Sequence, residues 1–255
     1  MKKALDFLLS ILYLLYFGIM LLLFHIVQLV AYNVFGKEAH KKTVVWFNFC
    51  LVHGWYLTGS HVHFEQRTVL PQPGERPIIF VANHQSMFDI PGLIWFLRKY
   101  YPYFVSKIEL AHGIPGISYN LRVGGAALID RKDGKKAVIE IAKLGQRIHD
   151  AKGSAAIFPE GTRSSSAQMK PFAAGGLMAL LKRAPDAMVV PVVIQGTGRF
   201  NPKGLFPLTS FTKMSWTVLP GLEPAGKTPD EIAQAARQAI LDYLDCTYTK
   251  TCESD

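Results

Sequence analysis

Cysteine is scarce in this chain of 255 residues, which contains only Cys50, Cys246 and Cys252. Their odd number, their wide spacing and the lack of any Cys-x-x-Cys pair predict neither a disulfide framework nor a zinc site, as is typical of proteins in a reducing compartment. The pair His61 and His63 has no further ligands at the spacing of a metal site, so we expect no bound metal.

Acidic residues are the minority charge, with 19 Asp and Glu against 28 Lys and Arg and a net charge of +9 at pH 7. Such an excess of positive charge favours an anionic partner: a phospholipid surface, a nucleic acid or an acidic carrier protein. The basic residues are scattered and no nucleic-acid-binding motif is present, so we expect no nucleic acid partner. The charge alone does not distinguish membrane phospholipids from an acidic carrier protein.

Charge is absent altogether from Phe7 to Phe24, and the apolar character continues to Phe35. About 20 apolar residues suffice to cross the hydrocarbon core of a bilayer. This stretch is long and has no small-residue cleavage site, so we interpret it as a retained anchor and not as a signal peptide.

A second apolar segment, from Thr43 to Thr58, is rich in aromatic residues that favour the membrane interface. We predict that residues 1–62 form a membrane-associated two-helix segment, and we prefer a helical hairpin in one leaflet to a full span. The alternative is that both segments are buried helices of a soluble core. The first segment argues against it, because it is too uniformly apolar for an ordinary amphipathic helix.

Residues 63–255 alternate short apolar runs with helical patterns. This alternation predicts an α/β domain with a mostly parallel or mixed sheet, flanked by helices on both faces. Ligands of such sheets bind where the strands end. The predicted strands are 77–82, 103–107, 125–130, 154–158, 188–194 and 213–219, and the predicted helices are 90–100, 135–150, 172–183 and 229–244.

The stretch from Asn83 to Asp89 follows the strand predicted at 77–82 and precedes a helix that starts near Pro91. On a continuous helix His84 and Asp89 would lie roughly 140° apart, so they meet only if the chain turns between them. A carboxylate beside a neutral imidazole fixes its tautomer and stabilises the cation formed on proton uptake, as a general base requires. The alternative is that Asp89 caps the helix and His84 is a polar residue closing a strand.

A second block, from Phe158 to Ser164, follows the strand predicted at 154–158 and carries Arg163 in a loop of Gly, Thr and Ser. The planar guanidinium of arginine matches two oxygens of a phosphate group, so Arg163 is a candidate phosphate ligand. A surface turn with a structural salt bridge is the alternative.

These blocks and three others occur in the order found in one family. They are Asn83-His84-x-Ser86-x-x-Asp89, Lys107-x-Glu109-Leu110, Leu128-Ile129-Asp130-Arg131, Phe158-Pro159-Glu160-Gly161-Thr162-Arg163-Ser164 and Val190-Pro191-Val192. The chain resembles the glycerolipid acyltransferases, and among them the bacterial lysophosphatidic acid (1-acyl-sn-glycerol-3-phosphate) acyltransferases. The resemblance implies transfer of an acyl chain from a thioester to the sn-2 hydroxyl of lysophosphatidic acid, giving phosphatidic acid for phospholipid biosynthesis.

The resemblance assigns His84 as the general base and Asp89 as the residue that orients it. Attack by the hydroxyl would be direct, without an acyl-enzyme, because no Gly-x-Ser-x-Gly motif occurs and no cysteine lies in a matched block. The expected substrate-binding residues are Lys107, Arg131, Glu160, Gly161, Thr162 and Arg163.

Arg163, together with Lys107 and Arg131, is expected to bind the acceptor phosphate, although Lys107 alone is also compatible with an ordinary surface lysine. Glu160 either binds a glycerol hydroxyl or pairs with an arginine. Gly161 either permits a tight backbone path beside the substrate or is a plain turn glycine. Backbone amides around Gly161 and Thr162 are candidate donors to the oxyanion of the tetrahedral intermediate.

The implied partners are membrane phospholipids, lysophosphatidic acid and an acyl thioester, either acyl-ACP or acyl-CoA, and no cofactor is expected. The implied location is the inner (cytoplasmic) membrane, with the catalytic domain facing the cytoplasm. Three alternatives stay open: the same chemistry on another lysophospholipid or a lyso-aminolipid, a lipid-binding protein without turnover, and a hydrolase. The intact pair of His84 and Asp89 argues against the second, because binding alone requires no base.

Val190-Pro191-Val192 either lines a pocket for the acyl chain or the acceptor, or belongs purely to the core.

Overall fold

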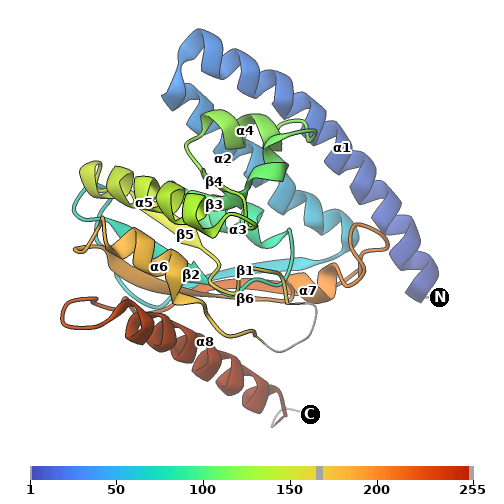
Figure 1. Ribbon diagram of the computed structural model, residues 1–255. Helices are drawn as coiled ribbons and strands as arrows, with labels where there is room; N and C mark the ends of the chain where they lie inside the picture. Colours follow the sequence, from blue (N-terminus) through green and yellow to red (C-terminus); the bar gives the residue numbers. More distant parts are fainter. Residues whose placement is uncertain (1, 165–168, 253–255) are drawn as a thin grey trace.

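The computed structural model describes residues 2–164 and 169–252, with side chains described as far as residue 246. Helices and strands alternate along most of the chain (Figure 1). The strands are β1 (His61–Gln66), β2 (Ile78–Ala82), β3 (Tyr103–Lys107), β4 (Ala127–Ile129), β5 (Ser154–Ile157), β6 (Met188–Gln195) and β7 (Lys213–Val218). The α-helices are α1 (Lys2–Phe35), α2 (Lys37–Gly54), α3 (Asp89–Phe96), α4 (Ile117–Val123), α5 (Gly134–Asp150), α6 (Ala174–Leu181), α7 (Thr197–Phe200) and α8 (Pro229–Cys252), with short 3-10 helices at Trp55–Thr58 and Ile108–Ala111.

The strands form one sheet in the order β1-β7-β6-β2-β5-β3-β4. Every neighbouring pair is parallel except β6 and β7, which are antiparallel. The predicted α/β fold with a mostly parallel or mixed sheet is therefore confirmed. Because β2 lies between β5 and β6, the residues that follow it leave from the middle of the carboxyl edge of the sheet.

Residues of the central strand β2 point alternately to the two faces of the sheet. Ile79 and Val81 pack with the apolar sides of α5, α6 and α8. Ile78 and Phe80 pack instead with buried residues of α1, α2 and α3. All five residues of β2 are buried, which explains why its sequence is a continuous apolar run and not an alternating one.

The helices α1 and α2 form a hairpin that turns at Gly36, where a φ of +83° suits glycine (Figure 1). Tyr13 of α1 is fully buried, and its hydroxyl accepts a hydrogen bond of 3.0 Å from the indole of Trp55. Trp55 in turn stacks on Trp216 of β7 at a centroid distance of 5.6 Å. The inner face of the hairpin is therefore continuous with the core of the sheet.

The outer face of α1 exposes large apolar side chains along its whole length. They include Leu8, Ile11, Leu15, Ile19, Leu22, Ile26, Val30 and Val34. Among the described residues, α1 is the one helix long and apolar enough to cross a membrane. A soluble monomer rarely exposes so extended an apolar surface, which marks this face for contact with a lipid or a protein.

Each predicted strand and helix is present, although the helix predicted over 90–100 ends at Phe96 and the helix predicted over 229–244 continues to Cys252. The structure adds β1, α4, the short helix α7 and the two 3-10 helices, none of which the sequence pattern predicts. β1 pairs with β7 at an edge of the sheet and is only partly buried, so its sequence lacks a clear apolar run. α4 has only seven residues, fewer than a periodic pattern needs to stand out.

Candidate active site

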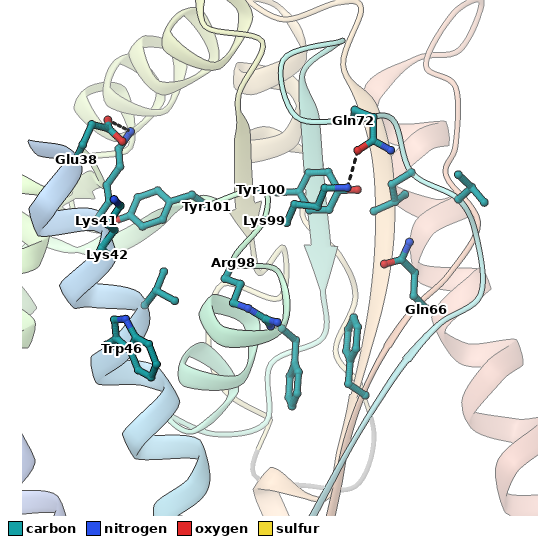
Figure 2. Close-up of a pocket in the computed structure, with 15 residues that line it drawn as sticks. Glu38, Lys41, Lys42, Trp46, Gln66, Gln72, Arg98, Lys99, Tyr100 and Tyr101 are labelled. Carbon is teal, nitrogen blue, oxygen red and sulfur yellow. Dashed lines mark hydrogen bonds and ion pairs between the residues drawn. The ribbon is translucent and has the colours of Figure 1, made fainter.

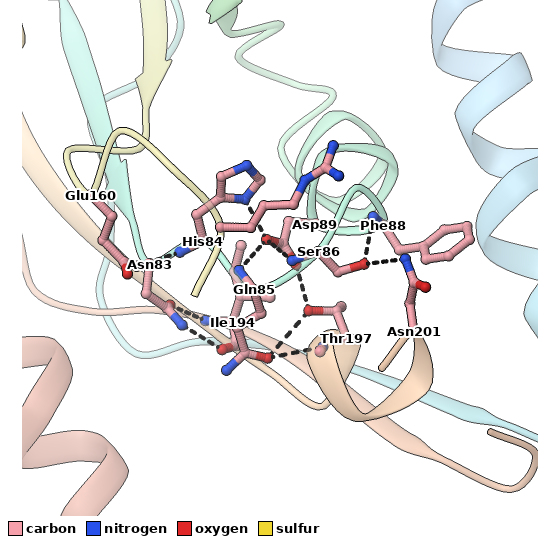
Figure 3. A network of polar contacts seen from close by, with 12 residues as sticks. Asn83, His84, Gln85, Ser86, Phe88, Asp89, Glu160, Ile194, Thr197 and Asn201 are labelled. Carbon is pink, nitrogen blue, oxygen red and sulfur yellow. Dashed lines mark hydrogen bonds and ion pairs between the residues drawn. The ribbon is translucent and has the colours of Figure 1, made fainter. Parts of the chain in front are cut away.

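Asn83 fixes the chain that leaves β2 to the neighbouring strand β6. Its amide nitrogen donates to the carbonyl oxygen of Ile194, and its amide oxygen accepts from the backbone N–H of Ile194, both at 2.8 Å (Figure 3). The donor and the acceptor of the buried side-chain amide of Asn83 are therefore both hydrogen-bonded, which offsets the free-energy cost of burying a polar group. The loop that begins at Asn83 therefore has a defined start at the carboxyl edge of the sheet.

His84 and Asp89 meet because the chain turns between them, as the sequence predicts. Helix α3 begins at Asp89, and Nδ1 of His84 lies 2.7 Å from Oδ2 of Asp89. An ionised carboxylate only accepts hydrogen bonds, so Nδ1 carries the proton and Nε2 keeps a lone pair. The imidazole stacks on the ring of Phe158 at a centroid distance of 4.1 Å. This geometry suits a base that acts through Nε2.

The carboxylate of Asp89 is fully buried and is surrounded by donors. Besides the imidazole, Oδ2 accepts from the backbone N–H groups of Gln85 and Ser86, at 2.7 and 2.9 Å, while Oδ1 accepts from the hydroxyl of Thr197 (Figure 3). The two N–H donors precede α3, whereas a capping carboxylate would accept from N–H groups inside the helix. Asp89 therefore closes the loop around His84 and does not act as a helix cap.

Reciprocal hydrogen bonds join the loops that follow β2 and β5. The backbone N–H of His84 donates to Oε1 of Glu160 at 2.7 Å, and the backbone N–H of Ser164 donates to the carbonyl oxygen of His84 at 2.8 Å. The second oxygen of Glu160 accepts from the backbone N–H of Lys170 at 2.9 Å. Burial raises the pKa of the Glu160 carboxyl, and its hydrogen bonds from His84 and Lys170 oppose that rise. These bonds make Glu160 a bridge between two backbones, and its contact with substrate stays a prediction.

Replacing Glu160 with glutamine is expected to lower the free energy of unfolding by about 1–3 kcal/mol, because one of the two backbone N–H groups would then face an amide NH2 group. Denaturant unfolding of detergent-solubilised protein measures the change. Glu140→Gln is the control, because Glu140 pairs with Lys143 on the exposed side of α5 and such surface pairs contribute little. Equal stability of the two variants would contradict the bridging role.

Three basic residues lie at the same carboxyl edge, beyond β5, β3 and β4. Lys107 ends β3 and pairs in register with Ile129, so Arg131 follows two residues later at that edge. Burial lowers the pKa of Arg131, the negative charge of Glu109 opposes this, and the positive charge of Arg163 adds to it. The charge of Arg131 is thus influenced both by Arg163 and, more strongly, by Glu109.

The loop from Gly161 to Arg163 is shaped by its own hydrogen bonds. Gly161 adopts a φ of +69°, and its N–H donates to the carbonyl oxygen of Phe158 at 3.0 Å, so this N–H is already used within the turn. The ammonium of Lys170 donates to the hydroxyl of Thr162 at 2.8 Å and to the carbonyl oxygen of Arg163 at 3.0 Å. The hydroxyl of Thr162 therefore faces Lys170, while the guanidinium of Arg163 is exposed.

An apolar cavity adjoins the loop between His84 and Asp89. It is lined by Met87 and Phe88 from that loop, by Arg163, and by residues of α2, β3 and α4. Tyr101 also lines it. Arg163 follows the end of β5 and Tyr101 precedes the parallel strand β3, so the cavity extends along β3 from the carboxyl edge of the sheet toward the amino edge. Such a space suits a hydrocarbon chain.

Sequence reasoning misses Lys170 and Thr197, both of which support the site. Lys170 lies beyond the matched block, and Thr197 is 108 residues from the carboxylate that it contacts. The one signal in the sequence that points to Thr197 is its position as a polar residue just beyond β6. β6 is a neighbour of β2 in the sheet. Val190-Pro191-Val192 is buried in the middle of β6. It does not lie at the sheet edge that carries the site loops. Among the described residues, no group of three His, Cys, Asp or Glu side chains could hold a metal ion.

Comparison with known proteins identifies relatives of this site and fold. The acyltransferase family model matches residues 61–195. A 1-acyl-sn-glycerol-3-phosphate acyltransferase from Chlamydomonas reinhardtii is 33% identical over 70% of this chain and 51% of its own length. The alpha form of that enzyme from Mus musculus is 29% identical over 75% of this chain and 66% of its own length. The chain thus matches about half to two thirds of the length of these curated relatives.

A solved structure, the 1-acyl-sn-glycerophosphate acyltransferase of Thermotoga maritima, superposes on this chain with a TM-score of 0.76 at 23% sequence identity. The match covers 97% of this chain and 98% of the other, so the two share one fold from the hairpin to the last helix. The family model covers more than half of the sequence, including both loops that meet around His84. This chain is a member of the acyltransferase family.

Proposed function

We propose that the protein transfers an acyl group from an acyl thioester to the sn-2 hydroxyl of lysophosphatidic acid and so makes phosphatidic acid. The observation that carries the proposal is the contact of 2.7 Å between His84 and the fully buried Asp89, in a loop whose Met87 and Phe88 line an apolar cavity together with Arg163. One site then offers a base, a cation for a phosphate and a space for a hydrocarbon chain. The names of the curated relatives support the same reaction.

In this mechanism Nε2 of His84 takes the proton of the acceptor hydroxyl as its oxygen attacks the thioester carbonyl. The negative charge of Asp89 stabilises the imidazolium that forms. Collapse of the tetrahedral intermediate breaks the carbon–sulfur bond, and His84 returns the proton to the leaving thiolate. Cys50 lies in α2 and Cys246 in α8, away from both site loops, which supports direct transfer without an acyl-enzyme. No cofactor is needed beyond the thioester, whether acyl-CoA or acyl-ACP.

We propose that the lysolipid acceptor enters the site from the membrane and that the phosphatidic acid product returns to it. The exposed apolar face of α1 supports insertion of the hairpin into one leaflet, and the inner face of the hairpin lines the apolar cavity through Phe17 and Phe47. A lysolipid would then reach the site without crossing water. The proposed location on the cytoplasmic side of the inner membrane comes from the resemblance, and the cysteine pattern, typical of a reducing compartment, supports the cytoplasmic side.

Acyl transfer by the detergent-purified full chain tests the proposal, with lysophosphatidate as the acceptor and lysophosphatidylcholine as the control acceptor. Formation of phosphatidate, with the control acceptor unused, would support it. Transfer to a different lysolipid alone would change the acceptor but keep the chemistry. Release of free fatty acid without an acceptor would indicate a hydrolase, and lipid binding without any product would indicate a protein without turnover.

Replacing Arg163 with alanine is expected to raise the KM for lysophosphatidate by about 10- to 100-fold, the loss typical of a charge-assisted hydrogen bond to a phosphate. The kcat should change less, because the phosphate does not react. Initial rates at varied acceptor concentration measure both values. Arg183→Ala removes an exposed arginine distant from the loop and serves as the control. An unchanged KM in Arg163→Ala would assign the phosphate to other residues.

A further inference from the structure

A second, open groove of about 760 Å³ lies between α2, the chain after α3, and the end of β1 (Figure 2). Neither His84 nor Arg163 lines it, so it lies away from the reacting groups, and Tyr101 is the residue that it shares with the apolar cavity. Tyr100 and Tyr101 precede β3, so the groove lies toward the amino edge of the sheet, whereas the active site is at the carboxyl edge. We call it the basic-aromatic groove. Its volume is that of a small-molecule site.

Four cations line the basic-aromatic groove: Lys41 and Lys42 on α2, and Arg98 and Lys99 directly after α3 (Figure 2). The one carboxylate in the lining, Glu38, forms an ion pair of 2.8 Å with Lys41. This leaves an excess of three positive charges.

Three of these cations have no carboxylate partner among the described side chains. Lys99 donates to the neutral amide of Gln72 at 2.6 Å, and the guanidinium of Arg98 lies over the ring of Trp95 at 4.1 Å. No ion pair within the described residues involves Lys42. Cations gathered in one concavity without counterions attract an anion.

The same groove has apolar walls. Trp46 of α2 is 58% exposed and Val69 is 90% exposed, although both are large and apolar. Phe64 and Phe96, which also line the groove, stack in parallel on each other at a centroid distance of 4.8 Å. An inorganic anion or an acidic protein surface would pair with the cations, but the apolar side chains of the groove would stay exposed to water. The combination fits an amphiphile with a negative head and a hydrocarbon tail.

One wall of the groove belongs to the hairpin that we assign to the membrane. Lys42 and Trp46 belong to α2, which packs against α1, and α1 exposes its apolar face along its whole length. A tryptophan beside lysines on such a hairpin is the usual composition of a membrane interface. We propose that the basic-aromatic groove binds one anionic phospholipid of the membrane, with its phosphate among the four cations and its first acyl carbons against Trp46. This inference rests on the proposed membrane association and not on acyl transfer.

Fluorescence quenching of Trp46 tests the proposal in the detergent-solubilised full chain. The probes are phosphatidylglycerol and phosphatidylcholine carrying brominated acyl chains, and the difference between the wild type and Trp46→Phe isolates the signal of Trp46 from the other tryptophans. We expect phosphatidylglycerol to quench Trp46 at a concentration at least tenfold lower than phosphatidylcholine does. The double variant Lys42→Gln/Arg98→Gln is expected to weaken phosphatidylglycerol binding by about 10- to 30-fold, from roughly a factor of five per basic residue.

The control variant Lys182→Gln/Arg183→Gln makes the same change in net charge at exposed positions outside the groove and is expected to bind as the wild type does. The single change Lys42→Gln is expected to give a smaller loss and guards against misfolding of the double variant. Equal quenching by both lipids, or unweakened phosphatidylglycerol binding in the double variant, would overturn the proposal. Loss of acyl carrier protein binding in the double variant, with lipid quenching intact, would assign the groove to that protein instead. None of these readouts depends on acyl transfer.

Discussion

Replacing His84 with alanine is expected to lower kcat for acyl transfer by about 10²- to 10⁴-fold, the range in which a positioned general base contributes. The KM for lysophosphatidate should change little, because the imidazole acts on the reacting hydroxyl and the phosphate is held elsewhere. The fold should persist, since the bonds to Glu160 and Ser164 use the backbone of His84 and not its ring. Steady-state kinetics and thermal unfolding of the same preparation measure both effects.

The chain offers a matched control for this experiment. His149 and Asp186 form a second histidine–carboxylate contact, with Nδ1 and Oδ1 at 2.9 Å, but this pair is exposed at the amino edge of the sheet. His149→Ala should leave kcat unchanged, since its side chain is 42% exposed and lies in neither site loop. A His84→Ala variant that keeps more than about a tenth of the wild-type kcat would remove His84 from the role of base.

Replacing Asp89 with asparagine is expected to reduce kcat by about 10²- to 10⁴-fold while the fold is retained. The amide oxygen can still accept from the N–H groups of Gln85 and Ser86. The amide nitrogen can donate to Thr197, whose hydroxyl accepts as readily as it donates. What is lost is the negative charge that stabilises the imidazolium of His84, and this loss acts on the rate and not on packing.

Replacing Asp89 with alanine instead separates rate from stability. Alanine removes the acceptor from two backbone N–H groups and one hydroxyl, all buried or half-buried, so the free energy of unfolding should fall by about 3–5 kcal/mol. Denaturant unfolding of the two variants should therefore differ although both are inactive. An active Asp89→Asn variant would show that the charge is unnecessary and that the carboxylate serves only to shape the loop.

The sequence is sufficient to predict the turn between His84 and Asp89 because every signal for it is local. A continuous apolar run requires a buried strand, Pro91 favours the first turn of a helix, and only a tight connection fits between them. The strands are predictable for the same reason: each of the buried strands reads as an apolar run between turn residues. The exposed edge strand β1 lacks that run, so only its pairing with β7 defines it.

The supporting residues are not predictable in this way, because their contacts join distant parts of the chain. The resemblance to known enzymes marks Glu160, but the sequence offers no sign that its carboxylate bridges the backbones of His84 and Lys170. Thr197 reaches Asp89 only because β2 and β6 are adjacent and parallel, so that the residues after them lie at one edge. The order of strands in a sheet depends on the packing of the whole chain and not on any one segment.

The bonds from Glu160 and Ser164 to the backbone of His84 span the loop that carries Arg163, so neither loop can shift without the other. The backbone positions that carry the imidazole of His84 and the guanidinium of Arg163 therefore keep a constant separation. In an acceptor, the matching length is the number of bonds between the reactive hydroxyl and the phosphorus atom. If His84 and Arg163 act as proposed, we expect a lysolipid with one additional carbon in that link to be a poorer acceptor than lysophosphatidate.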